Sequence, residues 1–194
     1  MTDERLIVAL DVHSMDEVES LVETLGDSVG FYKVGMELFY SMGAQVIEYL
    51  KGKQKKVFLD LKLHDIPNTV ASALRVLTRL GVDMINVHAT GGLIMMEKAL
   101  EAVKDEAEKL GIERPKLVAV TILSSISLKD WNRMWPDIDL DDQAVHLAKL
   151  VQEAGLDGVI SSPMEAETIR QACGEDFLIV TPGVRPAGAA INDQ

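Results

Sequence analysis

The chain alternates between short apolar runs and longer segments in which apolar residues recur at helical spacing. The apolar runs predict seven β-strands, at 6–12, 31–35, 57–63, 84–89, 117–123, 158–162 and 177–183. The helical periodicity predicts helices after Ser14, around 44–50, and over 67–80, 92–110, 143–154 and 164–172. Strands that alternate with helices in this way are typical of successive βαβ units, and therefore of a parallel sheet.

The first and third predicted helices carry clear start signals. Ser14 can cap the first helix, and Glu17 completes a capping box three residues later. Pro67 suits the first turn of the third helix, where its missing N–H has no intrahelical partner to lose. The segment 124–142 is polar and contains Trp131 and Trp135, so we expect a loop or a short helical excursion there. The tail 184–194 is rich in Ala, Gly and Pro and is expected to be a mobile loop.

The stretch 57–67 begins as a buried strand and then becomes charged. Side chains alternate between the two faces of a strand, so Asp60 and Lys62 share one face with Phe58, and His64 would follow if the strand continued. The other face carries Leu59, Leu61 and Leu63. Because a parallel sheet is covered on both faces, these charges would be partly buried and must be paired. The stretch is therefore a candidate site, with an exposed ion pair at a strand end as the alternative.

The charged positions of the first three strands suggest how the sheet closes. Asp11, Lys33, Asp60 and Lys62 all lie at or near the carboxyl ends of strands. Ends that converge on one point fit a (β/α)8 TIM barrel, whose sites lie on that rim. No G-x-G-x-x-G follows the first strand, which disfavours a dinucleotide fold. We therefore expect a single barrel domain over 1–194, with the eighth strand–helix unit missing from this chain.

Composition narrows the range of functions. The 194 residues are 47% hydrophobic and 26% charged, with a net charge of −12, which disfavours a broad nucleic-acid-binding face. Cys173 is the only cysteine, so no internal disulfide can form. The first residues have no signal-peptide pattern, and no apolar run approaches the ~20 residues of a membrane span. We expect a cytoplasmic protein that binds neither nucleic acid nor membrane.

The histidines add little to this picture. His88, at a strand end, is interpreted as a hydrogen-bonded structural residue rather than a site residue. His13, His64 and His146 lack metal-ligand spacing such as H-E-x-x-H.

Several motifs, in order along the whole chain, resemble those of the orotidine 5'-phosphate decarboxylase family. Asp60-x-Lys62-x-x-Asp65-Ile66-Pro67 is the most informative of them. The others are Asp11, Lys33-Val34-Gly35-Met36-Glu37, Asn86-Val87-His88-Ala89 with Gly91-Gly92, Val120-Thr121, Gly155-Leu156-Asp157-Gly158, Thr181-Pro182-Gly183-Val184-Arg185 and Asn192-Asp193-Gln194.

The resemblance implies a homodimer of barrels that converts orotidine 5'-monophosphate to UMP without cofactor or metal. It implies that Lys62 donates a proton to C6, that Asp60 lies beside the substrate carboxylate, and that Lys33 joins this array and reaches the ribose. The further residues that it implies are Asp11 at the ribose, Asp65, Ile66 and Thr69 offered across the dimer interface, Ser124 at the pyrimidine, and Pro182, Arg185 and Gln194 in a lid over base and phosphate.

The chain departs from the family pattern at its end. Family members continue through an eighth strand to a Gly-Arg pair that grips the phosphate, and nothing follows Gln194 here. We therefore expect a shortened form of a longer enzyme. Two alternatives remain: a Mg²⁺-dependent phosphosugar decarboxylase or synthase of the same superfamily, in which a Glu stands where this chain has Lys33, and an inactive truncated barrel.

Overall fold

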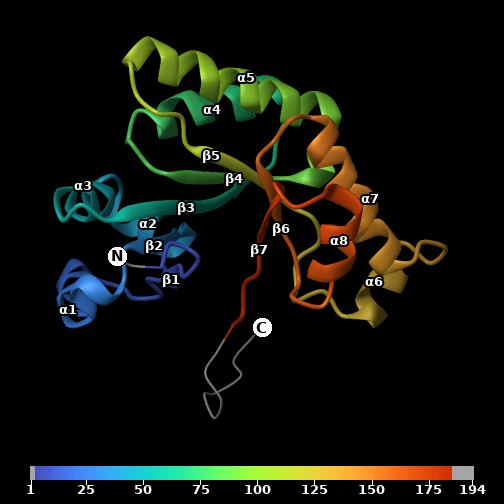
Figure 1. The fold of residues 1–194 in the computed structure, drawn as a ribbon, viewed down its shortest axis with the longest axis horizontal. Helices are drawn as coiled ribbons and strands as arrows, with labels where there is room; N and C mark the ends of the chain where they lie inside the picture. Colours follow the sequence, from blue (N-terminus) through green and yellow to red (C-terminus); the bar gives the residue numbers. More distant parts are fainter. Residues whose placement is uncertain (1–2, 185–194) are drawn as a thin grey trace.

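The computed structural model describes residues 3–184 and contains one curled, entirely parallel sheet (Figure 1). Its neighbouring strands follow the order of the sequence, β1-β2-β3-β4-β5-β6-β7. The strands are β1 Val8–Ala9, β2 Phe31–Gly35, β3 Lys56–Leu63, β4 Met84–His88, β5 Lys116–Val120, β6 Gly158–Ile160 and β7 Leu178–Val180. This order is that of a TIM barrel, with β1 and β7 as the two edges, and it confirms the predicted fold class.

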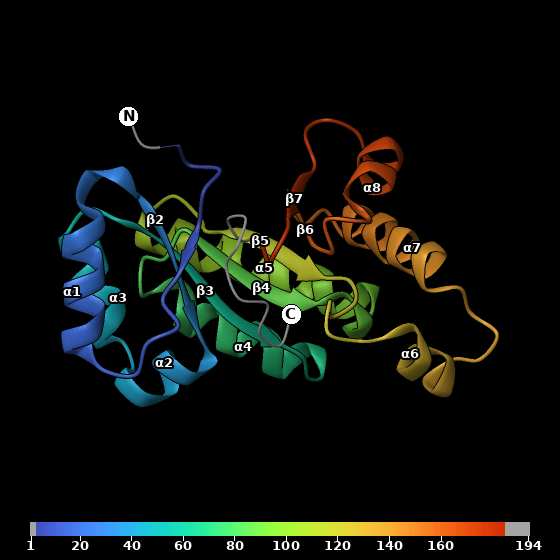
Figure 2. The same ribbon diagram turned by 90° about the horizontal axis from the view of Figure 1, so that it is seen from below.

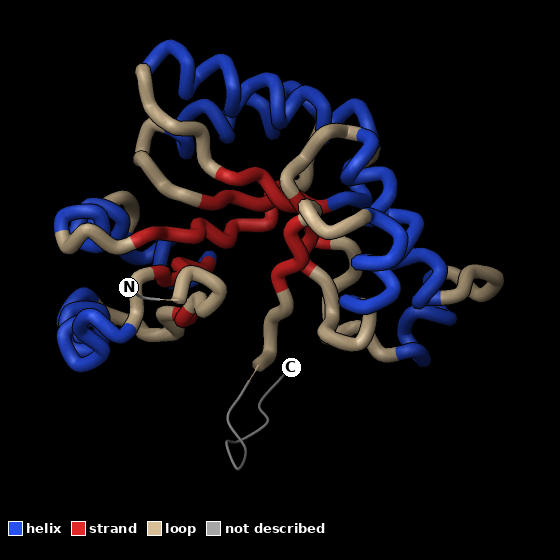
Figure 3. The backbone as a smooth tube through the Cα atoms, in the orientation of Figure 1, coloured by secondary structure: helices blue, strands red, loops and turns tan. Residues whose placement is uncertain are grey.

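Helices cover the outer side of the curl. Figures 1 and 2 place α1 and α3 at one end of the sheet and α7 and α8 at the other, with α4 and α5 packed together between them. The helices are α1 Met15–Leu25, α2 Met36–Met42, α3 Gln45–Gly52, α4 Pro67–Thr78, α5 Leu93–Leu110, α6 Leu128–Met134, α7 Leu140–Glu153 and α8 Ala166–Cys173. Two 3₁₀ turns lie at Gly26–Ser28 and Ala89–Gly91. Figure 3 shows how helices, strands and loops alternate along the described residues. None of the helices within residues 3–184 is both long and apolar enough to cross a membrane.

The two helix starts that were predicted from capping residues are confirmed. Ser14 and Glu17 form the expected capping box at α1, and Pro67 is at the start of α4. The segment 124–142 contains a short helix, α6, whose cap is Ser127. Helix α7 begins earlier than predicted because the Asp139 side chain accepts from the N–H of Asp142 and caps it. Helix α2, about two turns long and directly after β2, was not among the predicted helices.

Several strands are shorter than their apolar runs. The run 6–12 yields only β1, and the run 117–123 leaves the ladder after Val120. Leu10 and Ile122 are nevertheless buried. An apolar run indicates that its residues are buried, but a strand also requires backbone pairing with a neighbouring strand. The predicted strands therefore extend beyond the observed ones.

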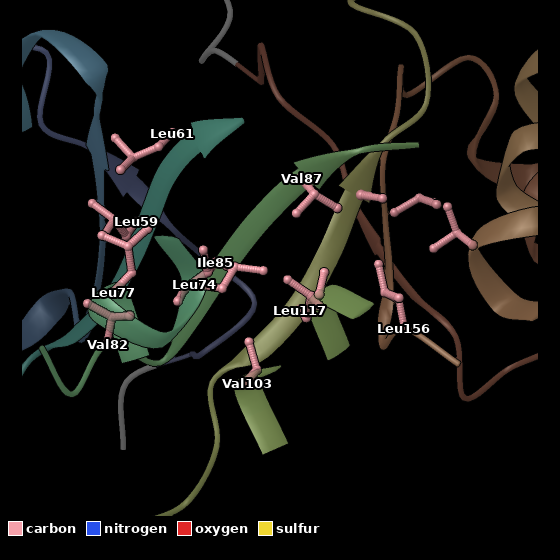
Figure 4. Packing of buried hydrophobic residues seen from close by; sticks show 14 of the residues in the cluster. Leu59, Leu61, Leu74, Leu77, Val82, Ile85, Val87, Val103, Leu117 and Leu156 are labelled. Atoms are coloured by element: carbon pink, nitrogen blue, oxygen red, sulfur yellow. The ribbon is translucent and has the colours of Figure 1, made fainter. Parts of the chain in front are cut away.

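Two apolar clusters lie on opposite faces of the sheet. The larger fills the space between sheet and helices and includes Leu59, Leu61, Ile85 and Leu117 (Figure 4). The smaller lies inside the curl and consists of Phe31, Phe58, Met84, Val118, Val120 and Ile160, with Ile7 and Val180 against it. The predicted division of β3, with leucines outside and Phe58 on the charged face, is confirmed.

Candidate active site

On β2, β3 and β4 the interior of the curl changes from apolar to polar two residues further along the strand. Phe31 is followed by Lys33 on β2, Phe58 by Asp60 on β3, and Met84 by Asn86 on β4. Because side chains on one face recur every second residue, the apolar cluster forms a floor and the polar residues stand toward the carboxyl ends of the strands. This rim is where sites of TIM barrels lie.

Asp60 and Lys62 form the centre of the polar layer. Lys62 Nζ donates to Asp60 Oδ1 over 2.7 Å, and the Asp60 side chain is only 10% exposed. A nearly buried carboxylate is stable only when paired and hydrogen-bonded. The interpretation of this pair as an exposed ion pair at a strand end is therefore wrong.

Lys33 and Asp11 extend the charged layer. Lys33 Nζ lies 3.7 Å from Asp60 Oδ2 and 3.5 Å from Asp11 Oδ1. The charges thus alternate in sign from Asp11 through Lys33 and Asp60 to Lys62. All four side chains line one cavity of about 290 Å³. Because opposite charges lie side by side, the free-energy cost of removing these four side chains from water is lower. The cavity can therefore accept a charged ligand.

The strand that carries Asp60 and Lys62 is irregular at these two residues. Leu59 pairs with Ile85 and Leu63 with Val87, so β3 advances four residues while β4 advances two. Within this bulge Lys62 has φ +51°, a left-handed conformation that is uncommon for a residue other than glycine. Bulges of this kind re-aim a side chain, and this one directs Lys62 back onto Asp60.

Asn86, which opens the motif Asn86-Val87-His88-Ala89, is a site residue for which no role was predicted. Its side chain is fully buried; Nδ2 donates to Asp60 Oδ1 over 2.6 Å, and Oδ1 accepts from the Lys62 N–H over 2.8 Å. The signal was present in the sequence, because an asparagine inside an apolar strand must find hydrogen bonds when buried.

His88 lies at the border of the polar layer. Its ring centroid is 5.3 Å from that of His64. Burial lowers the pKa of His88, and the nearby His64 and Lys62 lower it further. Within residues 3–184 no protein group hydrogen-bonds the His88 ring, and its interpretation as a hydrogen-bonded structural histidine stays a prediction. Both rings line a second cavity of about 620 Å³, together with Trp131 and Trp135.

Three predicted site residues stand apart from the charged layer within one chain. Asp65, Ile66 and Thr69 are exposed, and the Asp65 carboxylate accepts from the Ile66 N–H over 2.6 Å. None of them lines the cavity of about 290 Å³. Of the predicted site residues within 3–184, one chain therefore brings together Asp11, Lys33, Asp60 and Lys62.

Of the residues expected at the pyrimidine and in the lid, the structure describes Ser124 and Pro182. Ser124 is exposed in the loop after β5, and Pro182 is half-buried after β7; neither lines either cavity. Arg185 and Gln194 lie outside the described residues.

Comparisons with known proteins agree with this architecture. Residues 4–194 match the model of the family described as "Orotidine 5'-phosphate decarboxylase / HUMPS family". The chain is 50% identical over 190 residues to orotidine 5'-phosphate decarboxylase of Trichlorobacter lovleyi, an alignment that covers 98% of this chain and 78% of that protein. It is 46% identical to the enzyme of the same name from Nostoc sp., over 100% of this chain and 82% of the relative.

Solved structures give the same result. The crystal structure of orotidine 5'-phosphate decarboxylase from Lactobacillus acidophilus superposes with a TM-score of 0.87 at 43% identity, covering 95% of this chain and 83% of the other. An uncharacterized conserved protein from Geobacillus kaustophilus superposes with a TM-score of 0.85 at 45% identity, covering 91% and 82%. A match to nearly the whole chain at this identity leaves one conclusion: the chain belongs to the orotidine 5'-phosphate decarboxylase / HUMPS family.

Proposed function

We propose that this protein decarboxylates orotidine 5'-monophosphate to UMP in pyrimidine biosynthesis. The observation that carries the proposal is the layer of alternating charges, Asp11, Lys33, Asp60 and Lys62, on an apolar floor at the carboxyl rim of the sheet. Relatives about 50% identical are named for this activity.

Lys62 is the proposed proton donor. When the bond between C6 and the carboxylate breaks, CO2 leaves and the electron pair stays on C6, with little delocalisation into the ring. An ammonium close to C6 stabilises this developing charge and then supplies the proton of the new C6–H bond. Lys62 meets the requirement, because Asp60 holds its ammonium at 2.7 Å on the cavity wall.

Asp60 and its neighbours have complementary roles in this proposal. Asp60 lies beside the departing carboxylate, whose repulsion is relieved as CO2 leaves. Lys33 balances the charge of Asp60 and reaches the ribose with Asp11. Ser124 contacts the pyrimidine, and Pro182, Arg185 and Gln194 belong to a lid over base and phosphate. No cofactor and no metal enters this reaction scheme.

The proposal includes a homodimer in which each subunit completes the site of the other. The three residues expected at the interface are exposed, and within residues 3–184 none of them hydrogen-bonds to the charged layer of its own subunit. They are Asp65, Ile66 and Thr69. A site completed across an isologous interface accounts for their exposure beside the active strand. The substrate is then bound between subunits, and the enzyme acts in the cytoplasm.

The chain spans about four-fifths of the length of these relatives. In the proposal, the phosphate of the substrate contributes binding energy that closes the lid over the reacting ring.

The direct test is a spectrophotometric assay with purified protein pretreated with EDTA. Orotidine 5'-monophosphate loses absorbance as it is converted to UMP, and we expect rapid loss that EDTA does not slow. Activity that disappears with EDTA and returns with Mg²⁺ would contradict the metal-free assignment. A folded dimer that binds UMP without converting substrate would favour the inactive truncated barrel.

A metal-dependent phosphosugar decarboxylase or synthase is the second candidate, because the matched family also includes HUMPS enzymes. The position of Lys33 disfavours it. Its ammonium lies 3.7 Å from Asp60 and would repel a divalent cation there, where that group of enzymes is expected to carry a Glu.

A further inference from the structure

The charged layer depends on an uncharged residue on the neighbouring strand. Asn86 belongs to β4, directly beside the bulge of β3, and is fully buried between the two strands. Its two amide atoms contact two different parts of the site. Nδ2 reaches the carboxylate of Asp60, and Oδ1 reaches the main chain of Lys62.

Chemistry fixes the orientation of this amide. An ionised carboxylate only accepts hydrogen bonds, so the amide NH₂ must face Asp60. A backbone N–H only donates, so the amide oxygen must face Lys62. Rotating the amide by 180° would break both bonds at once. Asn86 therefore acts as a two-ended bridge with a single working orientation.

The bond to Lys62 replaces one that the bulge removes from the sheet. Where β3 advances four residues against two of β4, the ladder cannot pair every backbone group, and the Lys62 N–H turns to Asn86 instead. A buried N–H without a partner costs about 1–3 kcal/mol. The left-handed backbone of Lys62, at φ +51°, adds strain that the surroundings must hold in place.

The bond to Asp60 sets the direction of the carboxylate. Asn86 Nδ2 and Lys62 Nζ both donate to Oδ1, at 2.6 and 2.7 Å, which leaves Oδ2 facing Lys33. One oxygen is thus assigned to Lys62 and the other to Lys33. Without Asn86 the carboxylate could rotate and exchange its partners.

We propose that Asn86 is a positioning residue of the decarboxylase: it holds the Lys62 backbone in the left-handed bulge and orients the Asp60 carboxylate, so that the Lys62 ammonium meets C6 of the substrate. The proposal rests on the proposed function. Asn86 touches no reacting atom, and its effect passes through Asp60 and Lys62. Misplacement of a catalytic group by about 1 Å can cost on the order of 100-fold in rate.

The sharpest test is the near-isosteric variant Asn86→Asp, assayed across pH beside the wild type. A protonated carboxyl offers one donor and one acceptor, as the amide does, and reproduces both bonds. Once ionised, it has acceptors only and repels Asp60. We expect the kcat of Asn86→Asp, divided by that of the wild type, to fall at least about 10-fold as the pH rises from about 5.5 to 8.5. A ratio that stays near one from about pH 5.5 to 8.5 would overturn the positioning role.

Asn86→Ala and a control variant complete the design. Asn86→Ala can form neither bond, so we expect a kcat about 100-fold below wild type at every pH, with the affinity for UMP within about threefold. Thr78→Val removes a fully buried hydroxyl that donates to the Leu74 carbonyl on α4, away from the site, and should leave kcat unchanged. A wild-type kcat in Asn86→Ala would contradict the inference.

The assays distinguish failure of the proposed function from failure of the role proposed for Asn86. If the wild-type protein does not convert orotidine 5'-monophosphate, the proposed function is wrong, and the positioning role is overturned with it. If the wild type converts it and both Asn86 variants match it, only the role of Asn86 is overturned. Should Asn86→Ala not fold, the pH dependence of Asn86→Asp alone decides the question.

Discussion

Lys62 Nζ donates a 2.7 Å hydrogen bond to Asp60 Oδ1 from a residue only two positions along the same strand. In a regular strand these two side chains would stand about 6.5–7 Å apart along the chain. The bulge and the left-handed backbone of Lys62 bring them together. Both members of the ion pair thus come from one strand, and both side chains line the cavity.

Replacement of the proposed proton donor should separate catalysis from binding. We expect Lys62→Ala to lower kcat by at least about 1,000-fold, because both charge stabilisation and proton delivery at C6 are lost. Affinity for UMP, measured by isothermal titration, should change far less. Lys56→Ala is a matched control on the same strand, where Lys56 pairs with Glu4 at the opposite end. Near-wild-type kcat in Lys62→Ala would rule out the proton-donor role.

Subunit mixing tests the proposed homodimer, in which Asp65 acts in the site of the other subunit. We expect Lys62→Ala and Asp65→Ala proteins each to be inactive alone. If each site combines Lys62 of one subunit with Asp65 of the other, a mixed dimer contains one intact site. Unfolding and refolding the two variants together should then restore about a quarter of wild-type activity by random pairing.

A matched mixture gives the control for that experiment. Lys62→Ala mixed with Asp60→Ala should stay inactive, because Asp60 and Lys62 are joined within one chain. Restoration by both mixtures, or by neither, would contradict an interface that contributes Asp65.

The sequence was informative where local chemistry decides the structure. The capping box of Ser14 and Glu17 and the alternating faces of Phe58 and Leu59 follow from residue type and period alone. The bulge at Lys62 did not follow, because it depends on how β3 pairs with β4. The role of Asn86 was hidden for the same reason: its partners are distant in the sequence and meet it only through strand register.

Acid should weaken a structural ion pair at the opposite end of the sheet from the site. Asp157 accepts from Arg114 at 2.6 and 2.9 Å and from the Leu117 N–H at 2.8 Å. Burial alone would raise the pKa of Asp157, but these hydrogen bonds outweigh it and hold the pKa below its usual value. The unfolded chain therefore takes up the proton first as the pH falls, and the stabilisation is lost below about pH 4.

Asp157→Asn should remove this pH-dependent contribution to the free energy of unfolding. We expect the variant to lose about 1–3 kcal/mol of unfolding free energy at pH 7, measured by urea denaturation. The difference from wild type should shrink as the pH falls from 5 toward 2–3, about one unit either side of the unfolded pKa. Asp130→Asn, which removes an exposed ion pair with Arg133, is the control and should change stability by less than about 0.5 kcal/mol. A constant difference across this pH range would show that Asp157 contributes through packing alone.

Gly158 of β6 lies against Leu178 of β7, with no room for a Cβ between them. A Cβ at this position would lie 2.1 Å from the Leu178 carbonyl oxygen and 2.5 Å from Leu178 Cβ. The neighbouring strand cannot withdraw easily, because the Leu178 N–H donates to the Asp157 carbonyl at 3.0 Å. Overpacking of this kind costs about 1–3 kcal/mol, so Gly158→Ala should lower the urea midpoint accordingly.

The matched control is Gly52→Ala at the end of α3, where an added Cβ meets no atom within 4 Å. That variant should keep or slightly raise the stability of the wild type, since alanine favours the helix over glycine by about 1 kcal/mol. Because Gly158 lines neither cavity, we expect its variant to lose stability before it loses kcat per folded molecule. Equal urea midpoints for both variants would mean that β6 and β7 can separate without cost.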